Sequence, residues 1–285
     1  MHKQQILIAG CGDVGSTLGL ALQAQGHNVF GLRRTINQLP AGLQGIAGDL
    51  AVPASLQGQL PACDILVYSA AASQHDEAGY RSAYVQGLRN VLAALPCPPR
   101  LLLFTSSSGV YHQADGGWVD EQSPTEPGRF SGQIMLQAEA LALGSGIDAT
   151  VVRFSGIYGP GRNHLINQVR SGLGAPAEPA YYSNRIHRDD CAGVLQHLIG
   201  LHLQGRPLAP VYLASDDTPA TLHDVSQWLA TALGVTIHTT KALRRGGSKR
   251  CSNSLLRSTG YNFIYPDFRA GYSAILQQQQ DHPPT

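Results

Sequence analysis

The 285-residue sequence predicts an α/β fold, with a parallel, doubly wound sheet and a small C-terminal α/β lobe. Two observations predict the sheet. Short apolar runs alternate with segments of helical spacing up to residue 155, and the first such unit is a strand, a glycine-rich turn and a helix. A third observation predicts the lobe, because glycine and proline become frequent after residue 158.

Each element of the predicted sheet follows from its own residues. Short apolar runs indicate strands at 5–10, 27–32, 63–70, 100–107 and 148–155, and 45–50 is predicted to be the end of a strand. Helical spacing indicates helices at 16–26, 80–95 and 134–146. Gly26 ends the first helix, and the segment PCPP that begins at Pro96 halts the second.

The remainder of the chain is predicted to contain a helix at 188–203, a strand at 209–215 and a helix that opens with Thr221 as its cap. We assign residues 1–157 to the sheet domain, which the strands near 184–187 and 211–214 are expected to rejoin. The small lobe then comprises 158–183 and 216–276. The polar segment 277–285 is predicted to be disordered.

Composition excludes several classes of function. Charged residues make up 14% of the chain and the net charge is +1, which does not indicate a nucleic-acid or membrane partner. The apolar runs are too short to span a bilayer, and the N-terminal MHKQQ lacks the pattern of a signal peptide. The five cysteines are scattered, so we expect a reduced, cytoplasmic protein without zinc or a disulfide framework. No metal site is predicted.

The turn after the first strand reads GCGDVG and matches the pattern GxGxxG in Gly10, Gly12 and Gly15. In a Rossmann-type βαβ unit these glycines permit the tight turn, the approach of a pyrophosphate and the packing of helix on strand. The backbone N–H groups at the helix N-terminus, including those of Asp13 and Val14, would face the phosphates. We therefore predict a dinucleotide-binding domain; the alternative is a glycine-rich turn without a ligand.

The end of the second strand predicts the cofactor. NAD sites usually have an acidic residue there, whereas this chain has Arg33 and Arg34, which can receive a 2′-phosphate. We predict NADP(H) as the preferred cofactor, with NAD(H) as a possible one. The alternative is two solvated surface arginines. Asp49, after the next strand, either reaches the adenine or caps a turn.

The order of motifs along the chain resembles the extended short-chain dehydrogenases/reductases, the NAD-dependent epimerase/dehydratase family. The motifs are GCGDVG at 10–15, GDL at 48–50, SAAA at 69–72, YVQGLRNVL at 84–92, FTSSSGVY at 104–111, VVRFSGIYGPGR at 151–162, RIHRDDCAGVL at 185–195 and STGYNFIYPDFRAGYSAIL at 258–276. The resemblance implies an active site between a Rossmann domain and a small lobe, and a possible homodimer. It also implies further cofactor contacts from Asp49, Leu50, Ser69, Ala70, Ala71, Asn90, Thr105 and Ser106.

In that family a tyrosine transfers the proton, a lysine lowers the pKa of the tyrosine and bonds the nicotinamide ribose, and a serine or threonine holds the substrate oxygen. Aligned on the motifs, the serine is Ser107, but the tyrosine and lysine positions hold Ser131 and Met135. The only lysines are at positions 3, 241 and 249, so no Tyr-x-x-x-Lys exists in the Rossmann part in any register. A serine hydroxyl without a neighbouring cation is a poor acid or base.

The remaining candidates for chemistry are Ser107, Tyr111 and His187. Each has a structural alternative, as a strand-end hydrogen-bonding serine, a packed tyrosine, or a histidine bonded to backbone. Two functions remain open. One is an NADP-dependent oxidoreductase or epimerase/dehydratase with an unusual acid or base and an unidentified small-molecule substrate. The other is a non-catalytic NADP(H)-binding sensor or regulatory module.

Overall fold

The computed structural model describes residues 2–241 and 247–281, and the chain divides into two compact units. The first unit comprises residues 2–110, 126–153 and 191–212. The second comprises 111–125, 154–190 and the described part of 213–281.

The first unit is built on a seven-stranded parallel sheet with the order β12-β7-β5-β4-β1-β2-β3. Its strands are β1 Gln5–Ala9, β2 Asn28–Arg33, β3 Gln44–Ala47, β4 Ile65–Tyr68, β5 Leu101–Ser107, β7 Ala149–Phe154 and β12 Val211–Ala214. Strands β1 and β4 are buried almost throughout, as parallel strands between two layers of helix must be. The predicted fold class is confirmed.

The strand order reverses between β1 and β4, because the chain moves from β1 toward β2 and β3 on one side and resumes with β4 on the other. In open parallel sheets, the crevice at the carboxyl ends of the strands beside such a reversal is where ligands bind. Ile8 pairs with Gly31 of β2 and with Val67 of β4, so β1 lies at the centre of this arrangement.

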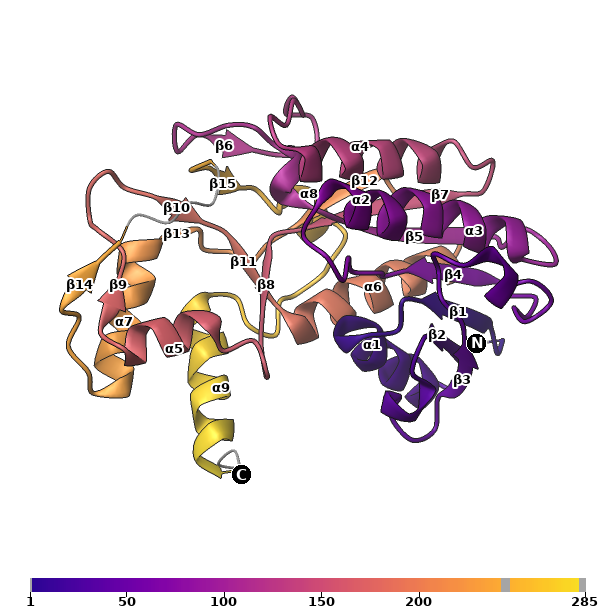
Figure 1. Cartoon of the computed structure of the whole chain (residues 1–285), viewed down its shortest axis with the longest axis horizontal. Helices are drawn as coiled ribbons and strands as arrows, with labels where there is room; N and C mark the ends of the chain where they lie inside the picture. Colours follow the sequence, from indigo (N-terminus) through magenta and orange to yellow (C-terminus); the bar gives the residue numbers. More distant parts are fainter. Residues whose placement is uncertain (1, 242–246, 282–285) are drawn as a thin grey trace. The chain divides into compact units, whose positions relative to one another are not determined.

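Helices cover both faces of the sheet. Helices α3 (Gly87–Ala94) and α4 (Phe130–Leu143) lie on one face, and α1 (Asp13–Ala24) and α6 (Arg188–Leu203) lie on the other (Figure 1). Short 3₁₀ turns η1 (Ile36–Gln38), η2 (Pro53–Ser55) and η4 (Ser108–Val110) complete the connections. The apolar stripes of these helices bury against the sheet, which supplies most of the stability of an amphipathic helix.

The helix predicted over 80–95 is interrupted. It begins as α2 (Glu77–Tyr80), widens into one π-helical turn, η3 (Arg81–Gln86), and continues as α3. The buried hydroxyl of Tyr68 donates a hydrogen bond of 2.5 Å to the carbonyl of Ala83 inside this turn. A side chain that bonds a helical carbonyl competes with the regular ladder, and such insertions accompany π turns.

The second unit consists of short two-stranded sheets and helices. The pairs are β8 (Gly156–Tyr158) with β11 (Arg185–His187), β10 (Tyr182–Ser183) with β13 (Ala220–Thr221), β9 (Leu173–Gly174) with β14 (Thr239–Thr240), and β6 (Trp118–Val119) with β15 (Arg250–Cys251). The helices are α5 (His164–Arg170), α7 (Leu222–Leu233), α8 (Ser254–Ser258) and α9 (Phe268–Asp281). The cap predicted for α7 is confirmed, since Thr221 Oγ1 accepts the Asp224 N–H at 3.1 Å.

Two expectations differ from the structure. Strand β11 pairs with β8 rather than with the seven-stranded sheet, so the segment 184–187 does not rejoin that sheet. The expected disorder from residue 277 is wrong for 277–281, because α9 continues to Asp281. Glutamine is a good helix former, and Tyr272 and Ile275 anchor the preceding turns in the core. Residues 282–285 lie outside the described residues.

Candidate functional site

The glycine loop after β1 has three glycines with three different constraints. Gly10 has a φ of +79°, and a Cβ on it would lie 2.5 Å from the Ala70 Cα. A Cβ on Gly15 would lie 2.9 Å from Ile8 Cγ2, where α1 packs on β1. By contrast, a Cβ on Gly12 would meet only the Gly10 carbonyl, at 3.9 Å, and otherwise project into open space. Turn, close packing and open approach are the roles that a dinucleotide site requires of these positions.

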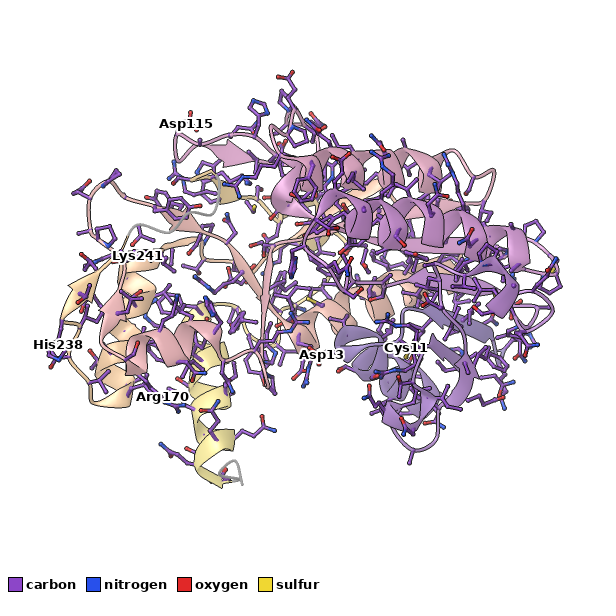
Figure 2. The ribbon with its side chains drawn as sticks, viewed as in Figure 1. Cys11, Asp13, Asp115, Arg170, His238 and Lys241 are labelled. Carbon is purple, nitrogen blue, oxygen red and sulfur yellow. The ribbon has the colours of Figure 1, made fainter. Side chains whose placement is uncertain are left out.

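Helix α1 begins at this loop, with Cys11 and Asp13 at its N-terminal end (Figure 2). Its N-cap is Gly12, and no side chain caps the helix. The first turn contains Asp13, Val14 and Gly15, and Asp13 is exposed whereas the other two are buried. An uncapped helix N-terminus beside an open glycine is a suitable place for phosphate oxygens.

The two arginines predicted to select the cofactor differ in their surroundings. Arg33 is half-buried, and its guanidinium donates to the carbonyls of Cys11 (3.4 Å) and Gln38 (3.3 Å) and to the Gln38 side chain. Arg34 is exposed and makes no hydrogen bond or ion pair within the described part of the chain. Arg33 therefore braces the loop after β1, and Arg34 is the cation that remains available.

The contacts of Asp49 and Asn90 are mainly local. Asp49 Oδ1 accepts the Ala51 N–H at 2.9 Å, which is the turn cap named as one of its two predicted roles. Asn90 Nδ2 donates to the Leu50 carbonyl at 2.8 Å and holds this loop against α3. These side chains shape the loop after β3 through hydrogen bonds that need no ligand.

The loop after β4 lies against the glycine loop. The Ser69 N–H donates to the Ala9 carbonyl at 2.8 Å, which extends the β1–β4 pairing, and the Ala70 backbone is the group that Gly10 approaches. Ala71 continues the same segment and is exposed. Thr105 Oγ1 donates to the Tyr68 carbonyl at 3.2 Å and joins β5 to β4. The structure thus brings the predicted cofactor residues of β1, β4 and β5 to one edge of the sheet.

A buried network fixes α4 against this edge. Ser106 Oγ donates to Glu139, and Arg153 forms an ion pair with the same carboxylate, with Nη2 2.7 Å from Oε2. All three side chains are buried. Because both oxygens of the Glu139 carboxylate are engaged, Ser106 and Arg153 together hold α4 in position.

Ser131 and Met135, the positions predicted to align with the family's tyrosine and lysine, lie on α4. Ser131 is half-buried in its first turn, and Met135 is buried with 5% of its surface exposed. Ser107, at the end of β5, is half-buried, and its Oγ accepts the Gly109 N–H at 3.0 Å. Its O–H remains able to donate to another oxygen.

The other two candidates belong to the second unit. Tyr111 is buried, and its carbonyl accepts a hydrogen bond from Lys249 Nζ at 3.4 Å. Lys249 is itself buried, and burial lowers its pKa. His187 is 2% exposed, and its Nδ1 accepts the Asp189 N–H at 3.2 Å, as predicted for a histidine bonded to backbone.

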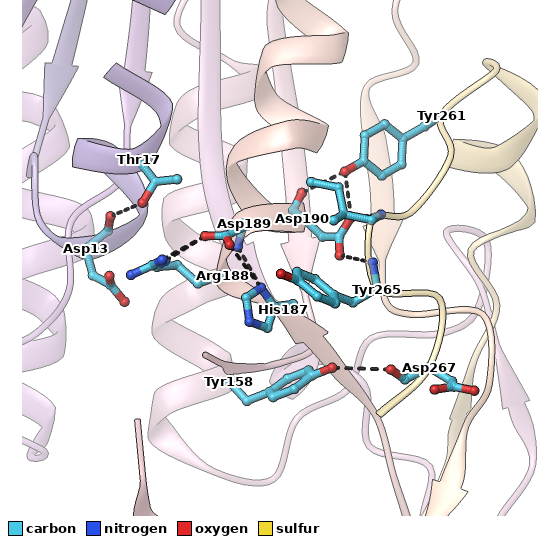
Figure 3. A network of polar contacts seen from close by, with 11 residues as sticks. Asp13, Thr17, Tyr158, His187, Arg188, Asp189, Asp190, Tyr261, Tyr265 and Asp267 are labelled. Atoms are coloured by element: carbon cyan, nitrogen blue, oxygen red, sulfur yellow. Dashed lines mark hydrogen bonds and ion pairs between the residues drawn. The ribbon is translucent and has the colours of Figure 1, made fainter. Parts of the chain in front are cut away.

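Aromatic rings surround His187. Its ring centroid lies 4.0 Å from that of Tyr265 and 5.2 Å from that of Tyr158. Next to them the Asp190 carboxylate accepts the Tyr261 hydroxyl at 2.9 Å and the Tyr265 N–H at 3.0 Å (Figure 3). Burial raises the pKa of Asp190, and these hydrogen bonds oppose the rise. The segment after α8 is therefore anchored on a buried carboxylate.

One group of residues was missed from the sequence. Tyr84 lies in the π turn, and its Oη accepts the Ala72 N–H at 3.4 Å. Its ring packs against that of Tyr80, which also contacts the rings of His75 and Phe130. The only sequence signal was the spacing of Tyr80 and Tyr84, one helical turn apart, which is also typical of core packing.

No set of three or more His, Cys, Asp or Glu side chains within residues 2–241 and 247–281 is grouped for metal binding. In the same ranges every helix is too short or too polar to cross a lipid bilayer.

Comparison with known proteins identifies the family. The model of the NAD dependent epimerase/dehydratase family matches residues 6–188. This chain belongs to that family. A structure from Methylobacillus flagellatus, reported as a candidate NAD-dependent epimerase/dehydratase, is 39% identical with a TM-score of 0.83, and the match covers 98% of this chain and 100% of that one.

Solved structures of lower identity share the fold. A structure reported as MoeE5 in complex with UDP-glucose and NAD is 22% identical, has a TM-score of 0.80 and is matched over 97% of this chain and 99% of its own. A short-chain dehydrogenase/reductase superfamily protein from Agrobacterium tumefaciens with bound NAD is 19% identical, with a TM-score of 0.78 and coverage of 97% and 98%. No curated protein matches the chain.

Proposed function

We propose that this chain is an NADP(H)-dependent oxidoreductase of the epimerase/dehydratase family that acts on a small molecule without the usual tyrosine–lysine pair. The observation that carries the proposal is the geometry of the glycine loop. Gly10 and Gly15 have no room for a side chain, whereas Gly12 faces open space beside an uncapped helix N-terminus. A tight turn, a close helix–strand contact and an open glycine at a helix N-terminus are together what a dinucleotide site requires of these three positions.

The preference for a 2′-phosphate rests on Arg34. An exposed guanidinium at the end of β2, with no partner among the described residues, can form charge-assisted hydrogen bonds to a phosphate. Two solved structures at low identity to this chain are reported with NAD. The absence of an acidic residue at 33 or 34 supports NADP(H) for this chain.

The chemistry must differ from that of relatives with the tyrosine–lysine pair. Met135 is buried and uncharged, and it cannot lower the pKa of a neighbouring hydroxyl or hydrogen-bond a ribose. When bound, a reduced nicotinamide cofactor would supply hydride. This chain would then have to orient a carbonyl substrate and deliver a proton from a group other than Ser131 or Met135.

The experiment that tests the proposal is a calorimetric titration of the purified protein with NADPH, NADP, NADH and NAD. We expect NADPH to bind at least about tenfold more tightly than NADH, because one phosphate–arginine interaction contributes about 1.5–3 kcal/mol. The Arg33→Ala/Arg34→Ala double variant should lose this preference. Absence of binding by all four dinucleotides would refute the proposal.

The second candidate is a non-catalytic NADP(H)-binding sensor. Met135 favours it, because a buried apolar side chain stands where the family has its lysine. The two functions separate in one assay, with bound NADPH exposed to a panel of aldehydes, ketones and sugar nucleotides. Stoichiometric binding with no oxidation of NADPH would favour the sensor, and slow oxidation by one class of carbonyl compound would favour the enzyme.

A further inference from the structure

A tyrosine hydroxyl lies beside the loop that follows β4. The Oη atom of Tyr84 is 3.4 Å from the backbone nitrogen of Ala72 and accepts its N–H. Two residues earlier in the same loop, the Ala70 backbone is the group that Gly10 approaches most closely. The Tyr84 hydroxyl is therefore one short loop away from the glycine turn that would receive the pyrophosphate.

The strand order indicates which half of a dinucleotide this hydroxyl would meet. Arg33 ends β2 and Arg34 follows it, on one side of β1, and Ala72 follows β4, on the other side. A dinucleotide lies across such a reversal with its pyrophosphate at the glycine turn. If the adenosine half lies on the β2 side of the glycine turn, the nicotinamide half lies on the other side, over the carboxyl ends of β4 and β5. Tyr84 is on that side.

The position of Tyr84 is fixed by a feature of the interior. The Tyr68 hydroxyl holds the Ala83 carbonyl, and this bond lies within the π turn that carries Tyr84. Gly87 follows directly, and a Cβ there would lie 2.4 Å from the Tyr68 Oη, so any other residue would displace this contact. The widened turn is thus built into the core, as π turns at functional sites commonly are.

The surroundings of Tyr84 determine which proton transfer it can perform. Its ring centroid lies 5.3 Å from that of Tyr80, which in turn packs edge-on against Phe130 at the start of α4. Burial raises the pKa of Tyr84, and the hydrogen bond from Ala72 only partly opposes this. A phenol in this environment stays protonated at neutral pH, which suits a proton donor and not a base.

We propose that Tyr84 supplies the hydroxyl that Ser131 and Met135 do not, by bonding the nicotinamide half of the cofactor and protonating the substrate. In the reducing direction, the carbonyl carbon gains hydride from the reduced dinucleotide while Tyr84 gives its proton to the carbonyl oxygen. The product is an alcohol, the cofactor is oxidised, and water returns a proton to the phenolate. The proposal rests on the proposed function, since it requires a bound dinucleotide.

The test compares Tyr84→Phe with Tyr80→Phe, a matched control that removes a hydroxyl from the same cluster. Calorimetry measures NADPH and 2′,5′-ADP, which lacks the nicotinamide half, on the wild type and both variants. We expect Tyr84→Phe to weaken NADPH binding about fivefold or more, the loss of one hydrogen bond, and to leave 2′,5′-ADP binding unchanged. Tyr80→Phe should alter neither.

The outcomes separate cleanly. A wild-type protein that binds no dinucleotide would refute the proposed function and this inference with it. Wild-type binding that Tyr84→Phe leaves unchanged, or an equal loss for NADPH and 2′,5′-ADP, would refute the inference alone, since the hydroxyl would then be structural.

Single-turnover oxidation of bound NADPH by a panel of aldehydes and ketones tests the proton transfer. We expect Tyr84→Phe to slow it at least about 100-fold, with loss of the solvent deuterium isotope effect, and Tyr80→Phe to leave it unchanged. If the wild type binds NADPH but oxidises it with no member of the panel, or if Tyr84→Phe is as fast as the wild type, Tyr84 is not a proton donor.

Discussion

The two units of the chain treat buried polar groups differently. In the first unit, Glu139 is buried with Arg153 and Ser106, and both partners bond its carboxylate. In the second unit, the buried carboxyl oxygens of Asp216 and the Nη1 of Arg185 have no hydrogen-bond partner among the described residues. A carboxyl and a guanidinium thus form a hydrogen-bonded ion pair in the first unit, whereas Asp216 and Arg185 form no hydrogen bond with each other in the second.

This difference has a physical consequence for each unit. A buried charge pair with its hydrogen bonds complete resists displacement, so the Glu139 network holds α4 and β5 in one register. An unpartnered buried carboxyl adapts by keeping its proton, and burial raises the pKa of Asp216 to about 8, partly offset by Arg185. The first unit is the rigid platform for a cofactor, and the second retains a polar group whose state depends on pH.

The comparison is tested most strongly at Glu139. Glu139→Ala leaves Arg153 charged and buried without its partner, so we expect the free energy of unfolding to fall by about 3–5 kcal/mol in urea titrations. The matched control is Glu77→Ala, which removes an exposed ion pair with Arg81 and should cost no more than about 0.5 kcal/mol. Equal effects of the two substitutions would contradict the role assigned to the network.

A second test addresses the backbone packing of the first unit. Gly10→Ala places a Cβ 2.5 Å from the Ala70 Cα at a φ of +79°, so we expect about 2–3 kcal/mol of destabilisation and loss of NADPH binding. Gly12→Ala has space for its methyl group, so its melting temperature should stay near that of the wild type. Its NADPH affinity should still fall at least about tenfold, because the methyl group occupies the approach of the phosphates. If Gly12→Ala bound NADPH as tightly as the wild type, the phosphates would not lie against Gly12.

The second unit is tested by pH. The folded-state pKa of Asp216, about 8, lies above the unfolded value of 3.8, so the folded state binds the proton more tightly. The contribution of this group to stability is complete below the unfolded pKa and is lost as pH rises through the folded pKa. We expect the unfolding free energy of Asp216→Asn to exceed that of the wild type by at least about 1–2 kcal/mol at pH 8 and to converge with it toward acid. A wild-type advantage at pH 8 would show that the Asp216 carboxylate is partnered.

The smallest effect is expected at the two arginines of the first unit. Arg34→Ala should weaken NADPH about tenfold and leave NADH unchanged, since its guanidinium has no other partner among the described residues. Arg33→Ala removes hydrogen bonds to Cys11 and Gln38 and should weaken both cofactors by a similar, smaller factor. Calorimetric titration of both variants with both cofactors distinguishes these patterns. If Arg33→Ala instead weakened NADPH alone and Arg34→Ala weakened both cofactors, Arg33 would be the residue that binds the 2′-phosphate.

Much of the first unit follows from local sequence. The alternation of apolar runs and helical segments predicts a doubly wound sheet, and the spacing of Gly10, Gly12 and Gly15 predicts a dinucleotide turn, because both depend on residues close in the chain. The sequence also shows directly that no lysine lies between residues 3 and 241, and this does not depend on how the motifs are aligned.

Other features depend on partners that are distant in sequence. The spacing over 80–95 predicts one continuous helix, but the hydroxyl of Tyr68, on a neighbouring strand, bonds Ala83 inside a π turn. Two adjacent arginines are alike in sequence, and the contacts of Arg33 with Cys11 and Gln38 distinguish it from the exposed Arg34.

The sequence by itself determined the class of fold, the place of the glycine turn and the absence of any lysine between residues 3 and 241, because these depend on local periodicity, short motifs and composition. The tertiary structure decided which polar groups are engaged and which are available. Ser106, Arg33 and Asn90 are predicted cofactor ligands, and the structure adds that their side chains bond Glu139, Cys11 and Leu50. A hydrogen bond requires contact in space, and strand order brings into contact residues whose separation along the chain gives no sign of it.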